Sequence, residues 1–254
     1  MRRTLKVLSA LLSYPTAELQ AAIPELRLAL DKEARLPQHN RDRLDCILEE
    51  IATGDLYDLQ ERYVLLFDRT RSLSLHLFEH VHGESRDRGQ AMVDLIKVYE
   101  DGGFTPTVSE LPDFLPLFLE YASTRAPAEA IELIGQPGHV LAALSERLAK
   151  RSSPYQSVFA ALVALANAKL DAAALNALRE EPDPAPDDLE ALDAAWEDEE
   201  VTFGPGALID ACGRDGLAAK MRQARRPAPG MERPTQTGPR TLVTHAGNRN
   251  RPEV

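Results

Sequence analysis

Apolar residues recur every three or four positions along most of the chain, which is the spacing of one face of an α-helix. One such stripe consists of Leu44, Ile47, Leu48 and Ile51. A single short stretch, residues 73–77, alternates between apolar and polar side chains in the manner of a strand. A lone strand would leave its backbone groups without hydrogen-bond partners, so we expect this stretch to be helical. The sequence therefore predicts an all-α protein with no sheet.

Residues that start and stop helices separate these stripes. Thr16 after Pro15 marks a helix start, and Asp55 and Asp113 are placed to cap two further helices. The pair Gly102–Gly103 marks a helix end. An Ala- and Leu-rich stretch over residues 158–178 predicts one long helix. We expect a single-domain, irregular multi-helix bundle.

The first residues, MRRTLKVLSALL, combine basic and apolar side chains in the manner of a secretory signal. Serines interrupt the apolar run, however, and four leucines share one helical face: Leu5, Leu8, Leu11 and Leu12. We therefore expect an amphipathic core helix rather than a cleaved signal. The longest apolar run, residues 158–166, is far shorter than the roughly 20 residues that span a bilayer. We expect a cytoplasmic protein without membrane insertion.

The formal net charge of −11 argues against a nucleic-acid partner, which would usually require a basic face. Residues 180–200 contain eleven acidic side chains and no Lys or Arg, whereas residues 221–254 contain seven Arg and two Glu. We predict a helical core over residues 1–178. An acidic linker and C-terminal helices packed on the core would follow over 179–220, and a disordered tail over 221–254. The two cysteines supply neither a disulfide framework nor a thiolate-rich metal site.

Residues 76–89 are the segment richest in functional groups. On a helix, His76 and His80 would share one face and could bind zinc, with His82, Glu79 or Glu84 as a third ligand. The pattern lacks the internal Glu that serves as general base in HExxH sites. The alternative interpretation is that these histidines hydrogen-bond across a helix end.

Two arginines in the same segment, Arg86 and Arg88, could bind a phosphate or a carboxylate, since a guanidinium matches both. No glycine-rich phosphate loop accompanies them, and ion pairs with Asp87, Glu84 or a neighbouring helix are the alternative. No serine, cysteine or carboxylate pair forms a convincing arrangement of nucleophile and base. The residues alone therefore give no convincing catalytic site.

Two motifs, YVLLF at residues 63–67 and ELPD at 110–113, resemble the signatures of the TorD/DmsD/NarJ family of all-helical redox-enzyme chaperones. Longer stretches resemble the NarJ branch of that family, and the resemblance covers about residues 5 to 205. The stretches that resemble the NarJ branch are residues 11–15, 67–69, 78–92, 111–117 and 195–201. One departure is Phe114, since the wider family commonly has His after the Pro-Asp pair.

The resemblance implies a non-catalytic chaperone dedicated to respiratory nitrate reductase. Such a protein binds the N-terminal segment of the apo catalytic alpha subunit, alone or with the beta subunit. It holds the subunit competent for molybdenum cofactor insertion and is not part of the final enzyme. It has no cofactor of its own, and molybdenum cofactor biosynthesis proteins are further candidate partners.

A target helix that is amphipathic and basic would need an apolar groove with an acidic rim. We expect aromatic side chains to form the groove and Asp68, Asp113 and Glu120 to form the rim. Histidines that face the target would make its binding sensitive to pH near neutrality. The full predicted set is Tyr63, Phe67, Asp68, Arg69, His76, Phe78, His80, His82, Arg86, Asp113, Phe114, Phe118 and Glu120.

Two other functions fit parts of the sequence. One is a metal-dependent hydrolase that uses His76, His80 and His82. The other is a general scaffold that binds through its acidic segment and basic tail, and its binding would be abolished by high salt.

Overall fold

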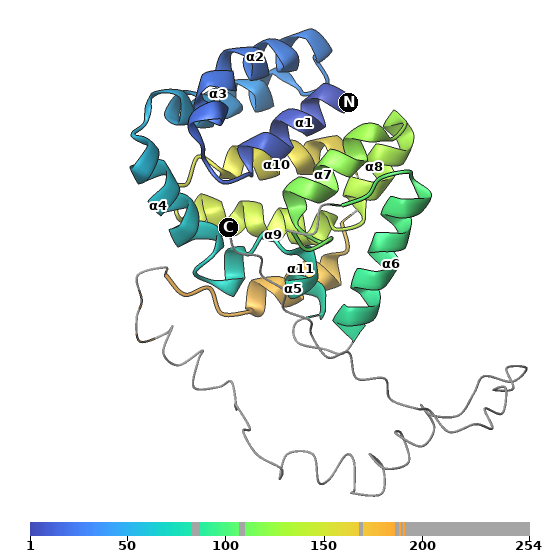
Figure 1. Cartoon of the computed structure of the whole chain (residues 1–254). Helices are drawn as coiled ribbons and strands as arrows, with labels where there is room; N and C mark the ends of the chain where they lie inside the picture. Colours follow the sequence, from blue (N-terminus) through green and yellow to red (C-terminus); the bar gives the residue numbers. More distant parts are fainter. Residues whose placement is uncertain (83–86, 107–109, 168–169, 186–187, 189, 191–254) are drawn as a thin grey trace, which may run out of the picture. The chain divides into compact units, whose positions relative to one another are not determined.

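The computed structural model describes residues 1–82, 87–106, 110–167, 170–185, 188 and 190, all within the unit Met1–Asp198. This part of the chain contains eleven α-helices, one 3₁₀ helix and no strand (Figure 1). The all-α prediction is confirmed. The later part of the predicted linker, the C-terminal helices and the tail lie outside the described residues.

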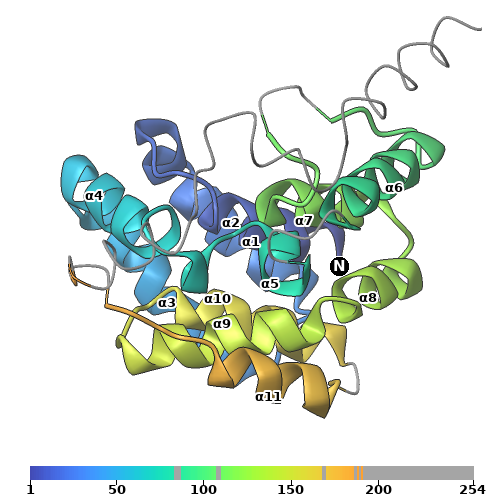
Figure 2. The same ribbon diagram turned by 90° about the horizontal axis from the view of Figure 1, so that it is seen from below.

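The helices pack as an irregular bundle. Helix α1 lies against α2 and α7, while α10 contacts α3, α8 and α9, and α11 covers α9 (Figure 2). Their bounds are α1 Arg2–Leu11, α2 Ala17–Glu33, α3 Gln38–Thr53, α4 Leu56–Phe67, the 3₁₀ helix η1 Arg71–Leu73, α5 Leu77–His82, α6 Asp87–Asp101, α7 Leu115–Thr124, α8 Pro127–Gly135, α9 Gly138–Lys150, α10 Gln156–Ala166 and α11 Ala172–Glu180.

Helix α1 is a core element. Its predicted apolar face is fully buried, with Leu5, Leu8, Leu11 and Leu12 all at 0% exposure. Glu33, the last residue of α2, accepts hydrogen bonds from the backbone N–H groups of Arg3 (3.2 Å) and Thr4 (2.7 Å). This carboxylate satisfies two N–H groups that a helix start leaves without intrahelical partners. The prediction of an amphipathic core helix is confirmed.

Several predicted helix ends are also confirmed. Thr16 caps α2 by accepting from the Leu19 N–H, and Asp55 caps α4 by accepting from the N–H groups of Tyr57 and Asp58. Helix α6 ends at Asp101, and Gly103 follows with a φ of +72°, a conformation that favours glycine.

The prediction of one long helix over residues 158–178 is wrong. Helix α10 ends at Ala166, because Asn167 adopts a left-handed conformation with a φ of +43°. Asn tolerates this conformation better than most residues. Asp171 then caps α11 by accepting from the N–H groups of Ala173 and Ala174. The apolar spacing continues across the break, so periodicity alone could not locate it.

Residues 73–77 are predicted to be helical, but in the structure they adopt three conformations. The 3₁₀ helix ends at Leu73, His76 forms an isolated antiparallel bridge with Phe114, and α5 begins at Leu77. We expected an extended segment here to lack backbone hydrogen-bond partners. The loop before α7 supplies them through a single extended residue, Phe114.

The start of the predicted acidic linker lies along α9. Arg151 donates to the Asp183 carboxylate (2.7 Å) and to the Pro184 carbonyl (2.8 Å). Arg147, which is 4% exposed, contacts Glu181 at 3.4 Å. Among the described residues, no helix is both long enough and apolar enough to cross a membrane.

The end of α6 provides a stability test. A Cβ at Gly102 would lie 2.5 Å from the Tyr121 hydroxyl oxygen, which donates to the Val98 carbonyl (2.9 Å). We predict that Gly102→Ala lowers the free energy of unfolding by about 1–3 kcal/mol, because the buried tyrosine must move. Urea denaturation measures the change.

Gly89, near the start of α6, is the matched control. No heavy atom of the described residues lies within 4 Å of a Cβ built there. Gly89→Ala should therefore stabilise the protein by a few tenths of a kcal/mol to about 1 kcal/mol. Equal losses in both variants would contradict the role of the Tyr121 contact.

Candidate functional site

Two segments that are distant in sequence meet beside α5. Residues 74–78 and 111–115 run antiparallel at the His76–Phe114 bridge. The Leu77 N–H donates to the Asp113 carbonyl (3.1 Å), and the Leu115 N–H donates to the Leu75 carbonyl (2.9 Å). Phe78 begins the family-like stretch 78–92, and residues 111–115 belong to the stretch 111–117, so the fold brings these two stretches together.

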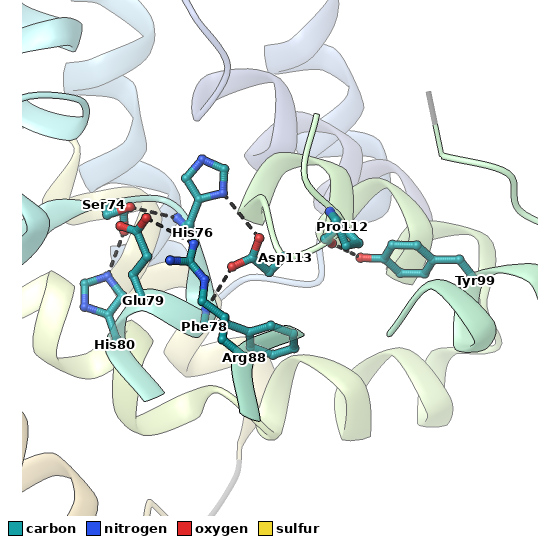
Figure 3. A network of polar contacts seen from close by, with 9 residues as sticks. All are labelled: Ser74, His76, Phe78, Glu79, His80, Arg88, Tyr99, Pro112 and Asp113. Atoms are coloured by element: carbon teal, nitrogen blue, oxygen red, sulfur yellow. Dashed lines mark hydrogen bonds and ion pairs between the residues drawn. The ribbon is translucent and has the colours of Figure 1, made fainter. Parts of the chain in front are cut away.

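Asp113 is the centre of this junction (Figure 3). Its side chain is fully buried. One carboxylate oxygen accepts from the Phe78 N–H in the first turn of α5 (3.0 Å), and the other lies 3.3 Å from Nδ1 of His76. A buried carboxylate is costly unless such partners compensate for lost water. Asp113 therefore caps α5 from a neighbouring segment.

This position corrects two predictions for Asp113. The residue at the start of α7 is Phe114, and Asp113 makes no cap there. Asp113 also does not lie on an exposed rim, because its side chain is buried under the bridge. In the sequence, Asp113 comes immediately before an apolar stripe, which favours a cap for the following helix. Its proximity to α5 is a tertiary contact that the sequence does not reveal.

His76 and His80 do not share a helical face. His76 precedes α5, and its hydrogen bond to Asp113 raises the pKa of the imidazole. His80 lies within α5 and contacts the Ser74 carbonyl through Nε2 (2.8 Å), while burial lowers its pKa. Of the two interpretations of these histidines, the one in which they hydrogen-bond across a helix end agrees with the contacts of His76 and His80.

No group of three or more His, Cys, Asp or Glu side chains is arranged to hold a metal ion in the described ranges. The ring of His82 instead packs edge-on against Phe78, with centroids 5.4 Å apart. Glu84, one of the predicted alternative ligands, lies outside the described residues. Nothing in the geometry of the described residues supports the metal-dependent hydrolase.

Helix α6 is fixed to the same junction. Arg88 donates to Glu79 of α5 (3.2 Å), which is the ion pair with a neighbouring helix that the sequence allowed. The hydroxyl of Tyr99, a fully buried residue, donates to the Pro112 carbonyl (2.6 Å). These contacts hold α5, α6 and the loop before α7 in one arrangement. Arg86 lies outside the described residues.

These three elements carry apolar side chains that the core covers only in part. Val81 and Leu111 are each 49% exposed. The partly buried members are Phe78, Met92, Leu95, Ile96, Phe104 and Phe114. We call these eight side chains the α5–α6 apolar surface. Exposed apolar side chains on a rigid support are typical of binding surfaces.

The structure separates the other predicted residues into two groups. Tyr63, Phe67 and Phe118 are buried in the core. The Tyr63 hydroxyl donates to the Leu12 carbonyl (2.8 Å), and the Phe67 ring packs against Tyr155 with centroids 5.0 Å apart. The second group is exposed and consists of Asp68 and Arg69 after α4 and Glu120 on α7.

Sequence reasoning missed Arg147 of α9. Its guanidinium donates to the carbonyls of Ser72 (2.7 Å) and Leu178, and so connects the segment before α5 to α11. Arginine is usually a surface residue. The available signal was its position between Leu144 and Leu148, on the apolar face of the helix.

Comparisons with known proteins identify the family. A sequence profile described as "Nitrate reductase delta subunit" matches residues 14–161. The nitrate reductase molybdenum cofactor assembly chaperone NarJ of Escherichia coli (strain K12) is 42% identical over 220 residues, which are 86% of this chain and 91% of NarJ. The chain belongs to the nitrate reductase delta subunit family.

Two further relatives of this nitrate reductase delta subunit family member have similar names. The probable nitrate reductase molybdenum cofactor assembly chaperone NarW of E. coli K12 is 41% identical over 78% of this chain and 83% of NarW. The probable NarJ chaperone of Bacillus subtilis (strain 168) is 32% identical over 63% of this chain and 86% of its own length. The resemblance to NarJ-type chaperones is confirmed.

The two histidines predict opposite effects of pH on stability. The pKa of His76 is raised above its ordinary 6.5, so its stabilising effect is complete below pH 6.5 and is lost as pH rises through the folded-state pKa. The pKa of His80 is lowered, so its contribution is complete above pH 6.5 and is lost as pH falls through the folded-state pKa.

Urea denaturation from about pH 5 to pH 9 measures both effects. His76→Gln should remove the loss of stability on the alkaline side, and His80→Gln should remove the loss on the acidic side. His39→Gln, at an exposed position on α3, is the control and should leave the wild-type profile unchanged. The two assignments are wrong if each variant retains both losses.

Proposed function

We propose that this chain is a molybdenum cofactor assembly chaperone for a respiratory nitrate reductase. The observation that carries the proposal is its 42% identity to E. coli NarJ over 91% of that protein. The related names of NarW and the Bacillus relative support the same function.

The proposed target is the N-terminal segment of the apo catalytic alpha subunit, alone or with the beta subunit. The chaperone holds that subunit competent for cofactor insertion in the cytoplasm and is not retained in the final enzyme. Its role is binding, without catalysis and without a cofactor of its own. Molybdenum cofactor biosynthesis proteins are proposed as further partners during insertion.

The proposed docking site is the α5–α6 apolar surface. An amphipathic target helix can lay its apolar side chains on such a surface. Phe78 and Phe114 are partly exposed there. The His82 ring packs against Phe78, and the His76 ring packs against Phe114. Asp113 acts as a positioning residue beneath the surface, since its carboxylate holds the start of α5.

The other predicted residues have more indirect positions. Tyr63, Phe67 and Phe118 would support the binding surface from the core, because they are buried. Exposed Glu120 remains a candidate for contact with basic side chains of the target. Asp68 and Arg69 follow α4 and remain predicted contacts.

Co-purification tests the function directly. We predict that the tagged chaperone retains the apo alpha subunit and loses it when the N-terminal segment of that subunit is deleted. Equal retention of both forms would contradict recognition of this segment. The same experiment with mature, cofactor-loaded nitrate reductase should show no stable complex.

A single substitution tests the surface. Phe114→Ser removes a partly exposed ring and places a favoured capping residue at the start of α7. We predict that affinity for the isolated N-terminal peptide, measured by calorimetry, falls at least about tenfold. Leu28→Ser, at a 56% exposed position on α2, is the control and should bind as wild type. Equal affinities would exclude this surface.

A further inference from the structure

Helix α4 has a second apolar face that its own fold does not use. Tyr57 is 80% exposed and Val64 is 40% exposed, and their separation of seven residues places them on one side of the helix. Leu59 and Leu66 are buried on the opposite side. Within the described residues, the Tyr57 side chain makes no hydrogen bond or ring contact. A core-packing role therefore does not explain this ring.

The loop between α1 and α2 lies beside α4 and carries a further exposed ring. Tyr14 is 47% exposed and packs edge-on against Tyr63, with ring centroids 5.6 Å apart. Gln60 of α4 donates to the Pro15 carbonyl (2.9 Å), which fixes the loop beside the helix. Two tyrosines and a valine are thus presented on supported backbone. Tyrosine is enriched where proteins bind one another.

Exposed carboxylates accompany these apolar side chains. Asp58, Glu61 and Asp68 fall on the same half of the helix as Tyr57, and all three are exposed. No ion pair within the described part of the chain involves them. The basic residue within α4, Arg62, is paired with Glu50 of α3 instead.

Asp58 lies in the first turn of α4, where a negative charge is favourable, but the rest of this charge pattern does not stabilise the helix. Asp58 and Glu61 are three positions apart, where like charges repel. Asp68 is the C-cap residue, and a negative charge at a helix C-terminus is unfavourable. An arriving cation would relieve both effects. Charge and exposed apolar area therefore point to the same kind of occupant.

We propose that Tyr14, Tyr57, Asp58, Glu61, Val64 and Asp68, here called the α4 outer face, dock a basic amphipathic segment of a protein partner. Apolar side chains of that segment would cover the tyrosines and Val64, and its Lys or Arg side chains would pair with the carboxylates. A second copy of the same face would bring like charges together, and an anionic lipid surface would be repelled.

This docking site is additional to the proposed function. The face contains none of the side chains of the α5–α6 apolar surface, and α4 and α6 lie at opposite sides of the helices in both views (Figure 1, Figure 2). The two surfaces can therefore be altered independently, and only Asp68 is also one of the predicted contacts of the alpha subunit.

The probe is a synthetic helical peptide of Leu and Lys with one apolar face, titrated into the full chain by fluorescence anisotropy. We expect saturable binding that weakens as salt increases, while a matched Leu and Glu peptide does not bind. The double variant Tyr57→Ser/Val64→Ser should bind at least about tenfold more weakly. The triple variant Asp58→Asn/Glu61→Gln/Asp68→Asn should show a similar loss and a smaller salt dependence.

Matched controls separate local from general effects. Glu25→Gln/Glu129→Gln/Glu132→Gln removes three exposed negative charges elsewhere and should change affinity less than about twofold, as should Leu28→Ser. Circular dichroism checks that each variant keeps its helix content. The proposal is overturned if the Leu and Lys peptide does not bind, or if the α4 variants bind it as wild type does.

These outcomes are independent of the proposed chaperone function. Co-purification with the apo alpha subunit, with and without its N-terminal segment, reports on that function alone. A protein that retains the subunit but does not bind the basic probe would keep the proposed function and lose the α4 docking site.

Discussion

The buried carboxylate of Asp113 connects the elements that form the candidate site. The carboxylate accepts from the Phe78 N–H at the start of α5 and lies beside His76. The backbone carbonyl of Asp113 accepts from the Leu77 N–H. A buried polar network of this kind favours one arrangement, because each alternative leaves a group without a partner. The partly exposed rings of Phe78 and Phe114 depend on this arrangement for their positions.

Much of the fold was predictable because helices are encoded locally. The buried face of α1, the Asp55 cap of α4 and the glycines after α6 all follow from residues close together in sequence. The break between α10 and α11 was missed, since Asn167 adopts its left-handed conformation without interrupting the apolar spacing. Propensity and periodicity are weak guides to single residues of this kind.

The site was predictable in its sequence location more than in its geometry. The family-like stretches that contain Phe78 and Asp113 do meet in space, and the histidines hydrogen-bond as one interpretation required. Burial of Asp113 could not be read from the chain, because acidic side chains are usually exposed. Tyr63 and Phe67 share helical spacing with Leu59 and Leu66, and this apolar face of α4 is buried. The role of Arg147 was hidden for the related reason that its partners are backbone carbonyls distant in sequence.

Hydrogen–deuterium exchange of the Asp113→Asn variant is the most direct test of the central claim that Asp113 positions α5 and the surface above it. We predict faster exchange of the amides of residues 76–82, because the neutral side chain holds the Phe78 N–H and His76 less well. Exchange in α2, which packs against α1 and α3, should be unchanged. Wild-type protection of residues 76–82 in this variant would contradict the account.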